Sequence, residues 1–239
     1  TPEWHAGAYY VQEASSMFLE QVFQQLPVPK NNLNVLDLCA APGGKSTHIL
    51  SLISENDLLV ANETIGLRNN ILRENIVKWG YPNVVITQND TKDFQRLPEF
   101  FDVAVVDAPC SGEGLFRKNT DAIKEWSIEN VQHCALRQKR ILTDILPCLK
   151  PEGILVYSTC TYNPQEDEQQ IEYMIQEHDM EYISLNVPPN WNIKHSISNY
   201  GYHFYQHLVK GEGFFLAVLK KKKTLHKNEN LKTKSLNIV

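Results

Sequence analysis

Short apolar runs alternate with amphipathic segments along most of the chain. The runs are rich in Val, Ile and Leu, as buried strands are, and they fall at 34–38, 58–61, 84–87, 102–106, 154–158, 181–185 and 213–220. Segments with helical spacing lie at 45–53, 63–79, 130–149 and 165–177. This alternation predicts an α/β fold with a seven-stranded, mostly parallel sheet covered by helices on both faces.

The flanking and connecting segments have a different character. We expect residues 1–30 to form a lead-in that packs on a catalytic domain spanning 31–220, and 186–212 to be an irregular loop region. Residues 221–239 form a lysine-rich tail that we expect to be disordered or to begin a further domain. The helix predicted at 165–177 is rich in acids at its start, where the helix dipole favours them.

Composition and charge narrow the class of protein. The chain has 239 residues, of which 42% are hydrophobic and 21% charged, so a full core is expected and wholesale disorder is excluded. The apolar runs are far shorter than the roughly 20 residues of a membrane span, and no N-terminal signal pattern is visible. Residues 220–239 carry a local charge of +6, which leaves −11 on the remainder. Such an acidic body argues against a broad nucleic-acid-binding surface.

The five cysteines show no spacing typical of a zinc site, so no metal is expected. A chain of this length needs no disulfides, which favours a reduced, cytoplasmic protein. Cys134 and Cys148 lie in a segment with apolar helical spacing and are expected to be buried. Cys39, Cys110 and Cys160 instead follow predicted strands. Cys39 is expected to supply shape and backbone only.

The first strand leads into a loop of small residues that is typical of nucleotide binding. Its members are Cys39, Ala40, Ala41, Pro42, Gly43, Gly44 and Lys45. The glycines allow close approach of a ligand to the backbone, although neither a Walker sequence nor GxGxxG is present. Glu63 ends the next strand, where an acid accepts hydrogen bonds from ribose hydroxyls, and Asp90 ends the third, where it can meet an exocyclic amine. An adenosine-containing cofactor is predicted, with NAD and a methyl donor both open.

Two cysteines end adjacent predicted strands, in Asp107-Ala-Pro-Cys110 and Ser158-Thr-Cys160. Because the carboxyl ends of parallel strands meet at one edge of a sheet, both thiols should face the same crevice. A thiolate is a strong nucleophile when its pKa is depressed. The absence of a suitable histidine argues against a Cys–His protease.

Three segments together resemble the Nol/Nop/Sun family of RNA cytosine-C5 methyltransferases. They are LDLCAAPGGKSTHI (36–49), DAPCSGEGLFRKN (107–119) and LVYSTCTYNPQEDEQQI (155–171). The similarity extends from about residue 5 to 220 and is strongest to bacterial ribosomal RNA enzymes of the Sun/RsmF type. Members of the family usually carry a further RNA-binding domain, and none is evident here.

This resemblance implies a Rossmann-like class I methyltransferase that uses S-adenosylmethionine. Segment 39–45 would wrap the cofactor, Glu63 would hold its ribose and Asp90 its adenine, while Asp107 would border cofactor and target base. Cys160 would attack C6 of the cytosine, and Cys110 would help to release the product. Ribosomal RNA or a ribosomal particle is the expected substrate, with no membrane partner.

The expected mechanism requires a base splayed out of its stack. Asp107 is a candidate proton donor near N3, and Cys110 or a water is a candidate base for the C5 proton. Lys45, Arg117 and Lys118 are candidates for phosphate contacts. Two alternatives remain: methylation of an amine or ribose hydroxyl without a covalent intermediate, and a catalytically silent RNA-binding or assembly module.

Overall fold

The computed structural model describes residues 1–25 and 31–223, and the predicted tail from 224 onward lies outside the described residues. Five strands form the parallel part of one sheet: β1 (Asn34–Asp37), β2 (Leu58–Asn62), β3 (Val84–Thr87), β4 (Phe101–Asp107) and β5 (Leu149–Thr159). Antiparallel strands extend it: β6 (Met180–Tyr182), β7 (Lys194–His195), β8 (Tyr202–Phe204) and β9 (Phe214–Lys221). The order is β3-β2-β1-β4-β5-β9-β8-β7, with β6 also paired to β9.

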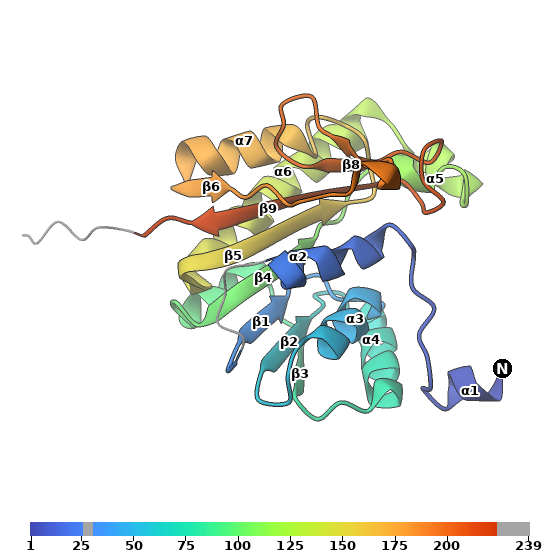
Figure 1. Cartoon of the computed structure of the whole chain (residues 1–239), viewed down its shortest axis with the longest axis vertical. Coiled ribbons are helices and arrows are strands. Elements are labelled where there is room, and N and C mark those ends of the chain that lie inside the picture. Colours follow the sequence, from blue (N-terminus) through green and yellow to red (C-terminus); the bar gives the residue numbers. More distant parts are fainter. Residues whose placement is uncertain (26–30, 224–239) are drawn as a thin grey trace, which may run out of the picture.

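Helices cover both faces of this sheet, as predicted (Figure 1). They are α1 (Pro2–His5), α2 (Leu19–Gln25), α3 (Gly44–Leu52), α4 (Gly66–Trp79), α5 (Thr120–Glu125), α6 (Ile128–Ile145) and α7 (Glu168–Glu177). Five short 3-10 helices connect elements: η1 (Ser16–Phe18), η2 (Thr91–Arg96), η3 (Glu113–Leu115), η4 (Leu146–Cys148) and η5 (Pro189–Trp191).

Alternation along the strands divides the core into two layers. On β4, Val103 and Val105 pack in the layer beneath α2, α3 and α4, whereas Ala104 and Val106 pack in the layer beneath α6 and α7. Strands buried on both faces have this continuous apolar pattern. The described part of the chain holds no helix with the length and apolar character that crossing a bilayer requires.

Two expectations about the sheet are wrong. The described residues form nine strands rather than seven, because the segment 186–212 contains β7 and β8. Both are very short, and they exist because β9 pairs with β8, which in turn pairs with β7. Strands of two and three residues carry no visible period, so only their tertiary partners define them.

The order of the strands places the candidate site. The chain leaves β1 toward β2 on one side, and β4 lies on the other side of β1. Open α/β sheets bind ligands beyond the carboxyl ends of their strands at this point of reversal. Cys39 follows β1 and Asp107 ends β4, so the loops singled out in the sequence flank the same crevice.

Candidate active site

The loop after β1 brings backbone into the crevice. Gly43 has a φ of +112°, a left-handed conformation that strains a side-chain-bearing residue, and it caps α3. Asp37 is fully buried below the loop and accepts a hydrogen bond from Ser46 Oγ at 2.6 Å. Burial raises the pKa of Asp37 to about 7, with the Ser46 hydrogen bond opposing the shift. The loop therefore lies above a carboxyl group that titrates near neutrality.

Glu63 directly follows β2 and is buried. Its Oε1 accepts the Ile65 backbone amide at 2.9 Å, and its Oε2 pairs with Arg68 Nη1 at 3.2 Å. The other terminal nitrogen of Arg68 donates to the Ala41 carbonyl at 2.8 Å. Arg68 thus connects the acid predicted to hold a ribose to the loop predicted to wrap the cofactor.

Asp90 lies at the start of η2, where its Oδ1 accepts the Lys92 amide at 3.2 Å. Both of its oxygens also accept from Arg140 Nη2, with Oδ2 at 2.7 Å. The hydrogen bond from Arg140 is the main reason that the pKa of Asp90 is lowered. Glu63, Asp90, Arg137 and Arg140 line a small cavity of about 70 Å³. The two acids share one cavity, and arginine side chains form part of its wall.

The two cysteines meet where β4 and β5 end. These strands are parallel neighbours, with Asp107 opposite Ser158. The sulfurs of Cys110 and Cys160 lie 2.9 Å apart, and the Cys160 amide donates to Cys110 Sγ at 3.3 Å. The hydrogen bond with Cys160, together with burial, raises the pKa of Cys110 well above its usual value. Cys110 therefore keeps its proton and is placed to share it with Cys160.

A cavity of about 230 Å³ opens beside this pair. Its lining includes Cys160, Asp107, Lys45, Phe214 and most of the segment 39–45. Asp107 accepts hydrogen bonds from Lys45 Nζ at 2.9 Å and Ser158 Oγ at 2.8 Å. Burial alone would lower the pKa of Lys45, but the neighbouring anionic groups, Asp107 foremost, raise it. The cavity thus presents a thiol, a carboxylate and an ammonium group to one another.

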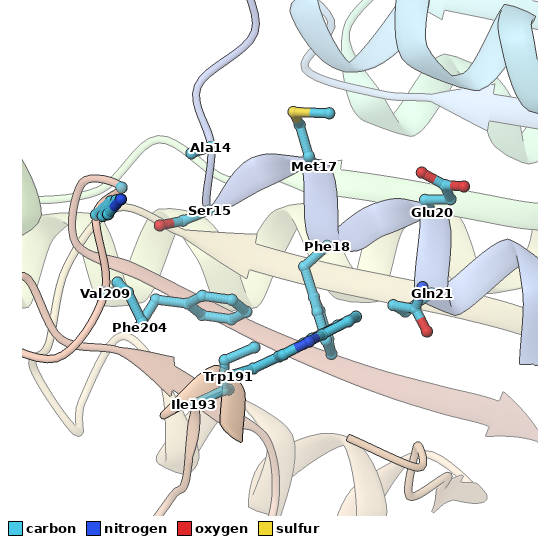
Figure 2. Close-up of a pocket in the computed structure, with 12 residues that line it drawn as sticks. Ala14, Ser15, Met17, Phe18, Glu20, Gln21, Trp191, Ile193, Phe204 and Val209 are labelled. Carbon is cyan, nitrogen blue, oxygen red and sulfur yellow. The ribbon is translucent and has the colours of Figure 1, made fainter. Parts of the chain in front are cut away.

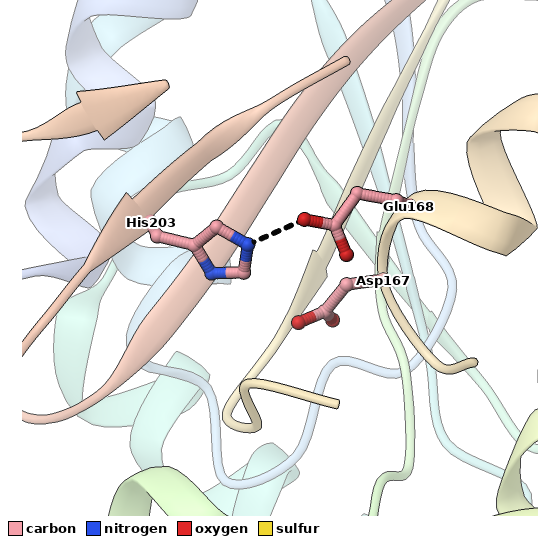
Figure 3. Close-up of side chains that lie close together, drawn as sticks. All are labelled: Asp167, Glu168 and His203. Atoms are coloured by element: carbon pink, nitrogen blue, oxygen red, sulfur yellow. Dashed lines mark hydrogen bonds and ion pairs between the residues drawn. The ribbon is translucent and has the colours of Figure 1, made fainter. Parts of the chain in front are cut away.

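Three acidic residues after Cys160, Glu166 to Glu168, are buried next to the site. The sequence predicted only that these acids favour the start of a helix. In the structure Glu166 and Asp167 are fully buried, and Glu168, which begins α7, is 8% exposed. Glu168 pairs with His203 at 2.8 Å (Figure 3). Among the described residues, Asp167, Glu168 and His203 are the one group whose side chains lie close enough together to hold a metal ion. His203 Nε2 is already committed to Glu168, so we assign the group to structure.

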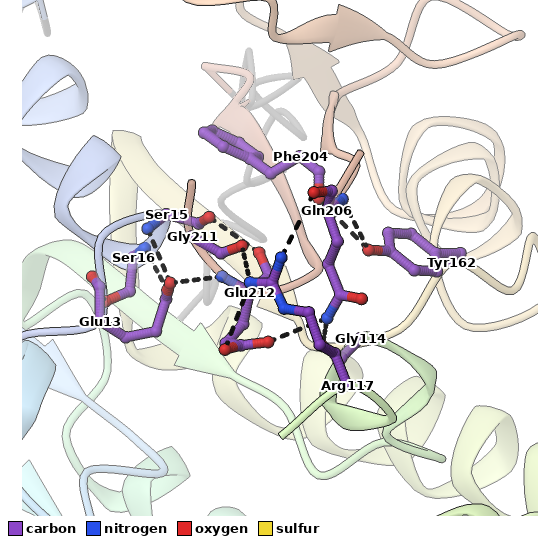
Figure 4. Close-up of polar contacts among 10 residues, drawn as sticks. All are labelled: Glu13, Ser15, Ser16, Gly114, Arg117, Tyr162, Phe204, Gln206, Gly211 and Glu212. Carbon is purple, nitrogen blue, oxygen red and sulfur yellow. Dashed lines mark hydrogen bonds and ion pairs between the residues drawn. The ribbon is translucent and has the colours of Figure 1, made fainter. Parts of the chain in front are cut away.

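The wall opposite the cofactor loop comes from three distant segments (Figure 4). Glu13 accepts the Glu212 amide at 2.8 Å, and Glu212 in turn accepts from Gln206 Nε2 at 2.9 Å and pairs with Arg117 at 3.4 Å. Arg117 also donates to the Gly211 carbonyl at 2.8 Å. The phosphate contact proposed for Arg117 thus competes with internal partners, and Lys45 faces Asp107 instead.

A larger apolar groove of about 450 Å³ lies on the other side of this wall (Figure 2). Phe18, Phe204 and Trp191 line it, with Met17 at its edge. Its lining includes neither cysteine nor any of the predicted cofactor residues. Size alone therefore does not identify the chemical site, and the smaller cavity beside the thiols is the candidate.

The structure brings most of the predicted site residues into two adjacent cavities that share Cys39. Burial raises the pKa of Cys39. Cys134 and Cys148 are buried, as predicted, and all five cysteines are free. Sequence reasoning missed Glu166, Gln138 and Gly114. Their partners lie many tens of residues away, and the acidic run after Cys160 was the available signal for the first of them.

Comparisons with known proteins agree with this geometry. Residues 24–220 match the family described as 16S rRNA methyltransferase RsmB/F. The chain is 39% identical over 226 residues to ribosomal RNA small subunit methyltransferase F of Aeromonas salmonicida, which covers 92% of this chain and 47% of that protein. The Escherichia coli protein of the same name is 37% identical over 227 residues, covering 92% and 46%. The chain thus spans about half the length of these curated relatives.

A solved structure supports the same relationship. NSun6 from Pyrococcus horikoshii, crystallised with SFG, superposes with a TM-score of 0.82 at 29% identity, covering 93% of this chain and 56% of that one. A methyltransferase homologue from the same organism gives a TM-score of 0.73 at 32% identity, covering 92% and 70%. The predicted class of fold is confirmed.

Proposed function

The chain belongs to the RsmB/F family of 16S rRNA methyltransferases, and from this membership and the site geometry we propose that it methylates C5 of a cytosine in ribosomal RNA. The observation that carries the proposal is the pair of sulfurs 2.9 Å apart, with Cys160 lining the cavity that Asp107 and the 39–45 loop also line. Methylation of an oxygen or an exocyclic amine needs orientation only. Activation of the C5–C6 double bond, in contrast, uses a nucleophilic thiol that adds covalently to C6.

The residues that line the two adjacent cavities fit S-adenosylmethionine. SFG, which accompanies the archaeal neighbour, is an analogue of it. Buried Glu63 offers carboxylate oxygens for ribose hydroxyls, and Asp90 lines the same cavity for the adenine. When bound, the cofactor supplies an electrophilic methyl group. Arg140, whose side chain is 56% exposed, can move with little loss of stability to enlarge that cavity.

Cys160 is the proposed nucleophile. The proton of its thiol passes to water, and the thiolate adds to C6 of the cytosine, so that C5 gains enamine character and accepts the methyl group. During this addition negative charge builds up toward N3 and O2, where preorganised polar groups stabilise it, and the charge is discharged when C5 takes the methyl group. Lys45 and Asp107, paired at 2.9 Å, supply an ammonium group for this charge and a carboxylate for the exocyclic amine.

Cys110 is proposed to assist release. After methyl transfer the C5 proton passes to water, the carbon–sulfur bond at C6 breaks, and the Cys160 sulfur leaves with the electron pair. Because its pKa is raised, Cys110 is a thiol and donates a hydrogen bond to the leaving sulfur. This geometry favours Cys110 as a proton donor over the role of base for the C5 proton.

Mass spectrometry of nucleosides tests the proposal. The protein and labelled S-adenosylmethionine are incubated with ribosomal RNA and with 30S particles, and the RNA is then digested. We expect label in 5-methylcytidine. Label in an N-methylated or ribose-methylated nucleoside would support non-covalent methylation, and binding without any transfer would support a silent module.

A further inference from the structure

The two catalytic loops come from different strands, so their relation must be fixed by contacts between them. Part of that fixation is backbone: Gly114, on the loop that follows Cys110, donates its amide to the Cys160 carbonyl at 2.8 Å. A Cβ on Gly114 would lie 2.8 Å from that carbonyl oxygen, which is too close. These contacts hold the main chain, but they do not fix the residues that directly follow each cysteine.

Glu166 makes that second connection. It lies six residues after Cys160 on the same segment, and its Oε1 accepts the Ser111 amide at 2.9 Å while its Oε2 accepts Ser111 Oγ. Gln138 Nε2, from α6, donates to the same Oε1 at 2.9 Å. Ser111 Oγ also lies 3.0 Å from Thr161 Oγ1. The residue after Cys110 is thus bonded both to Glu166 and to the residue after Cys160.

The burial of Glu166 makes this connection stiff. The residue is 0% exposed, and its main-chain oxygen accepts the Tyr157 hydroxyl at 2.6 Å. A buried carboxylate that loses its donors costs more free energy than an exposed one, because water cannot replace them. Three donors converge on Glu166, two of them from the residue beside a catalytic cysteine.

We infer that Glu166 is a positioning residue that sets the separation and orientation of the Cys110 and Cys160 sulfurs. The inference about geometry stands on the contacts alone, and its catalytic consequence rests on the proposed function. Two substitutions separate reach from charge. Glu166→Gln keeps the reach and an oxygen for the Ser111 and Gln138 amides, whereas Glu166→Asp keeps the charge and withdraws it by one methylene.

Phenylarsine oxide reports the separation of the sulfurs without any methylation. The arsenic forms bonds to both sulfurs, the two thiol protons leave with the oxide oxygen as water, and no change of oxidation state occurs. We expect the wild-type protein to bind one equivalent, and Cys110→Ala or Cys160→Ala to lose that tight binding. Glu166→Asp should bind at least about 10-fold more weakly, and Glu166→Gln within about 3-fold of wild type.

Glu168→Gln is the matched control, since this neighbouring buried acid bonds His203 rather than Ser111. It should bind the arsenical as the wild type does. Binding of S-adenosylmethionine serves as the test of folding. If Glu166→Asp does not fold, Ser111→Ala removes the side-chain half of the same connection and should weaken arsenical binding several-fold. Wild-type arsenical affinity in folded Glu166→Asp, or in Ser111→Ala when that variant must decide, would overturn the inference.

Methyl transfer gives the catalytic readout. A misplacement of about 1 Å costs on the order of 10²-fold in rate, so kcat of Glu166→Asp should fall by about that factor while KM for S-adenosylmethionine is unchanged. Glu166→Gln should retain most of the wild-type kcat. If no 5-methylcytidine forms with the wild type, the proposed function fails while the arsenical series still decides the role of Glu166.

Discussion

The two ends of the candidate site are held in different ways. At the cofactor end, Glu63 and Asp90 pair with Arg68 and Arg140, whose side chains are 45% and 56% exposed. At the thiol end, Cys110 and Cys160 are held by backbone contacts and by the buried carboxylate of Glu166. An ion pair exposed on both sides, as Asp90–Arg140 is, contributes about 0–1 kcal/mol and exchanges readily with water or ligand. Buried hydrogen bonds are costly to break.

This difference suggests that the two ends have separate roles, one in cofactor binding and the other in the chemical step. The cofactor end can release its arginines when a ligand arrives, so substitutions there should alter affinity. The thiol end must hold two sulfurs in one geometry, so substitutions there should alter the rate of chemistry. Substitutions at each end therefore separate the two roles.

Cys160→Ala should abolish methyl transfer, because Cys110 does not line the cavity and Cys39, which does, has a pKa that burial raises. Affinity for S-adenosylmethionine should remain within about 3-fold of wild type, since the substitution removes neither Glu63 nor Asp90. Labelled methyl transfer and calorimetric titration of the cofactor measure the two quantities. Full turnover by the variant would show that the nucleophile is misassigned.

Asp37, which lies buried below the 39–45 loop, should give the chain a measurable pH dependence of stability. Its pKa is about 7 in the folded protein against 3.8 ordinarily. Between these values the folded chain holds a proton that the unfolded chain has released, so stability falls as pH rises and is level above about 7. Asp37→Asn removes this pH dependence. Between pH 5 and pH 8 the free energy of unfolding of the variant should therefore rise relative to that of the wild type, by at most about 3 kcal/mol.

Urea unfolding of both proteins at pH 5 and pH 8 measures the difference. Acids other than Asp37 titrate in wild type and variant alike, so their contribution cancels in the comparison. Parallel profiles would mean that Asp37 is not protonated in the folded protein at pH 5.

Gly114→Ala should impair chemistry without removing any reactive group. Its Cβ would press on the Gly213 carbonyl group and on the Cys160 carbonyl oxygen, 2.8 Å away, so the backbone beside the nucleophile must shift. We expect kcat to fall on the order of 10²-fold, with affinity for the cofactor retained. Single-turnover methylation measures the rate, and urea unfolding of the variant checks that it is folded. Equal rates for Gly114→Ala and wild type would remove the positioning role of this contact.

The cofactor end should give the smallest effects. Glu63→Gln should weaken cofactor binding about 10-fold, the value of one charge-assisted hydrogen bond, and leave kcat near wild type. Asp90→Asn should weaken it only a few-fold, because this carboxylate is partly exposed and already shared with Arg140. Cofactor titrations at low and high salt measure both. A large loss of kcat in either variant would contradict the division between the two ends.

The fold and the loops of this site could be predicted from the sequence because both depend on residues that are close together in the chain. The strand at 84–87 and the loop 39–45 are examples, each defined by residues adjacent in the chain. Contacts between residues that are distant in the chain could not be predicted in this way. Arg140 meets Asp90 across 50 positions, and Glu166 meets Ser111 across 55. The acidic run that contains Glu166 was visible, but its burial follows only from the packing of α6 and α7.

The proposed attack by Cys160 is tested most directly by mapping the covalent bond itself. Cys110→Ala should retain the nucleophile and lose the proton donor for release, so it should accumulate an RNA–protein adduct that survives a denaturing gel. Digestion and mass spectrometry of that adduct should place a cytidine with C5 methylated on the peptide that contains Cys160. A nucleotide attached at any other residue, or active Cys110→Ala protein with no adduct at any time, would contradict covalent catalysis by Cys160.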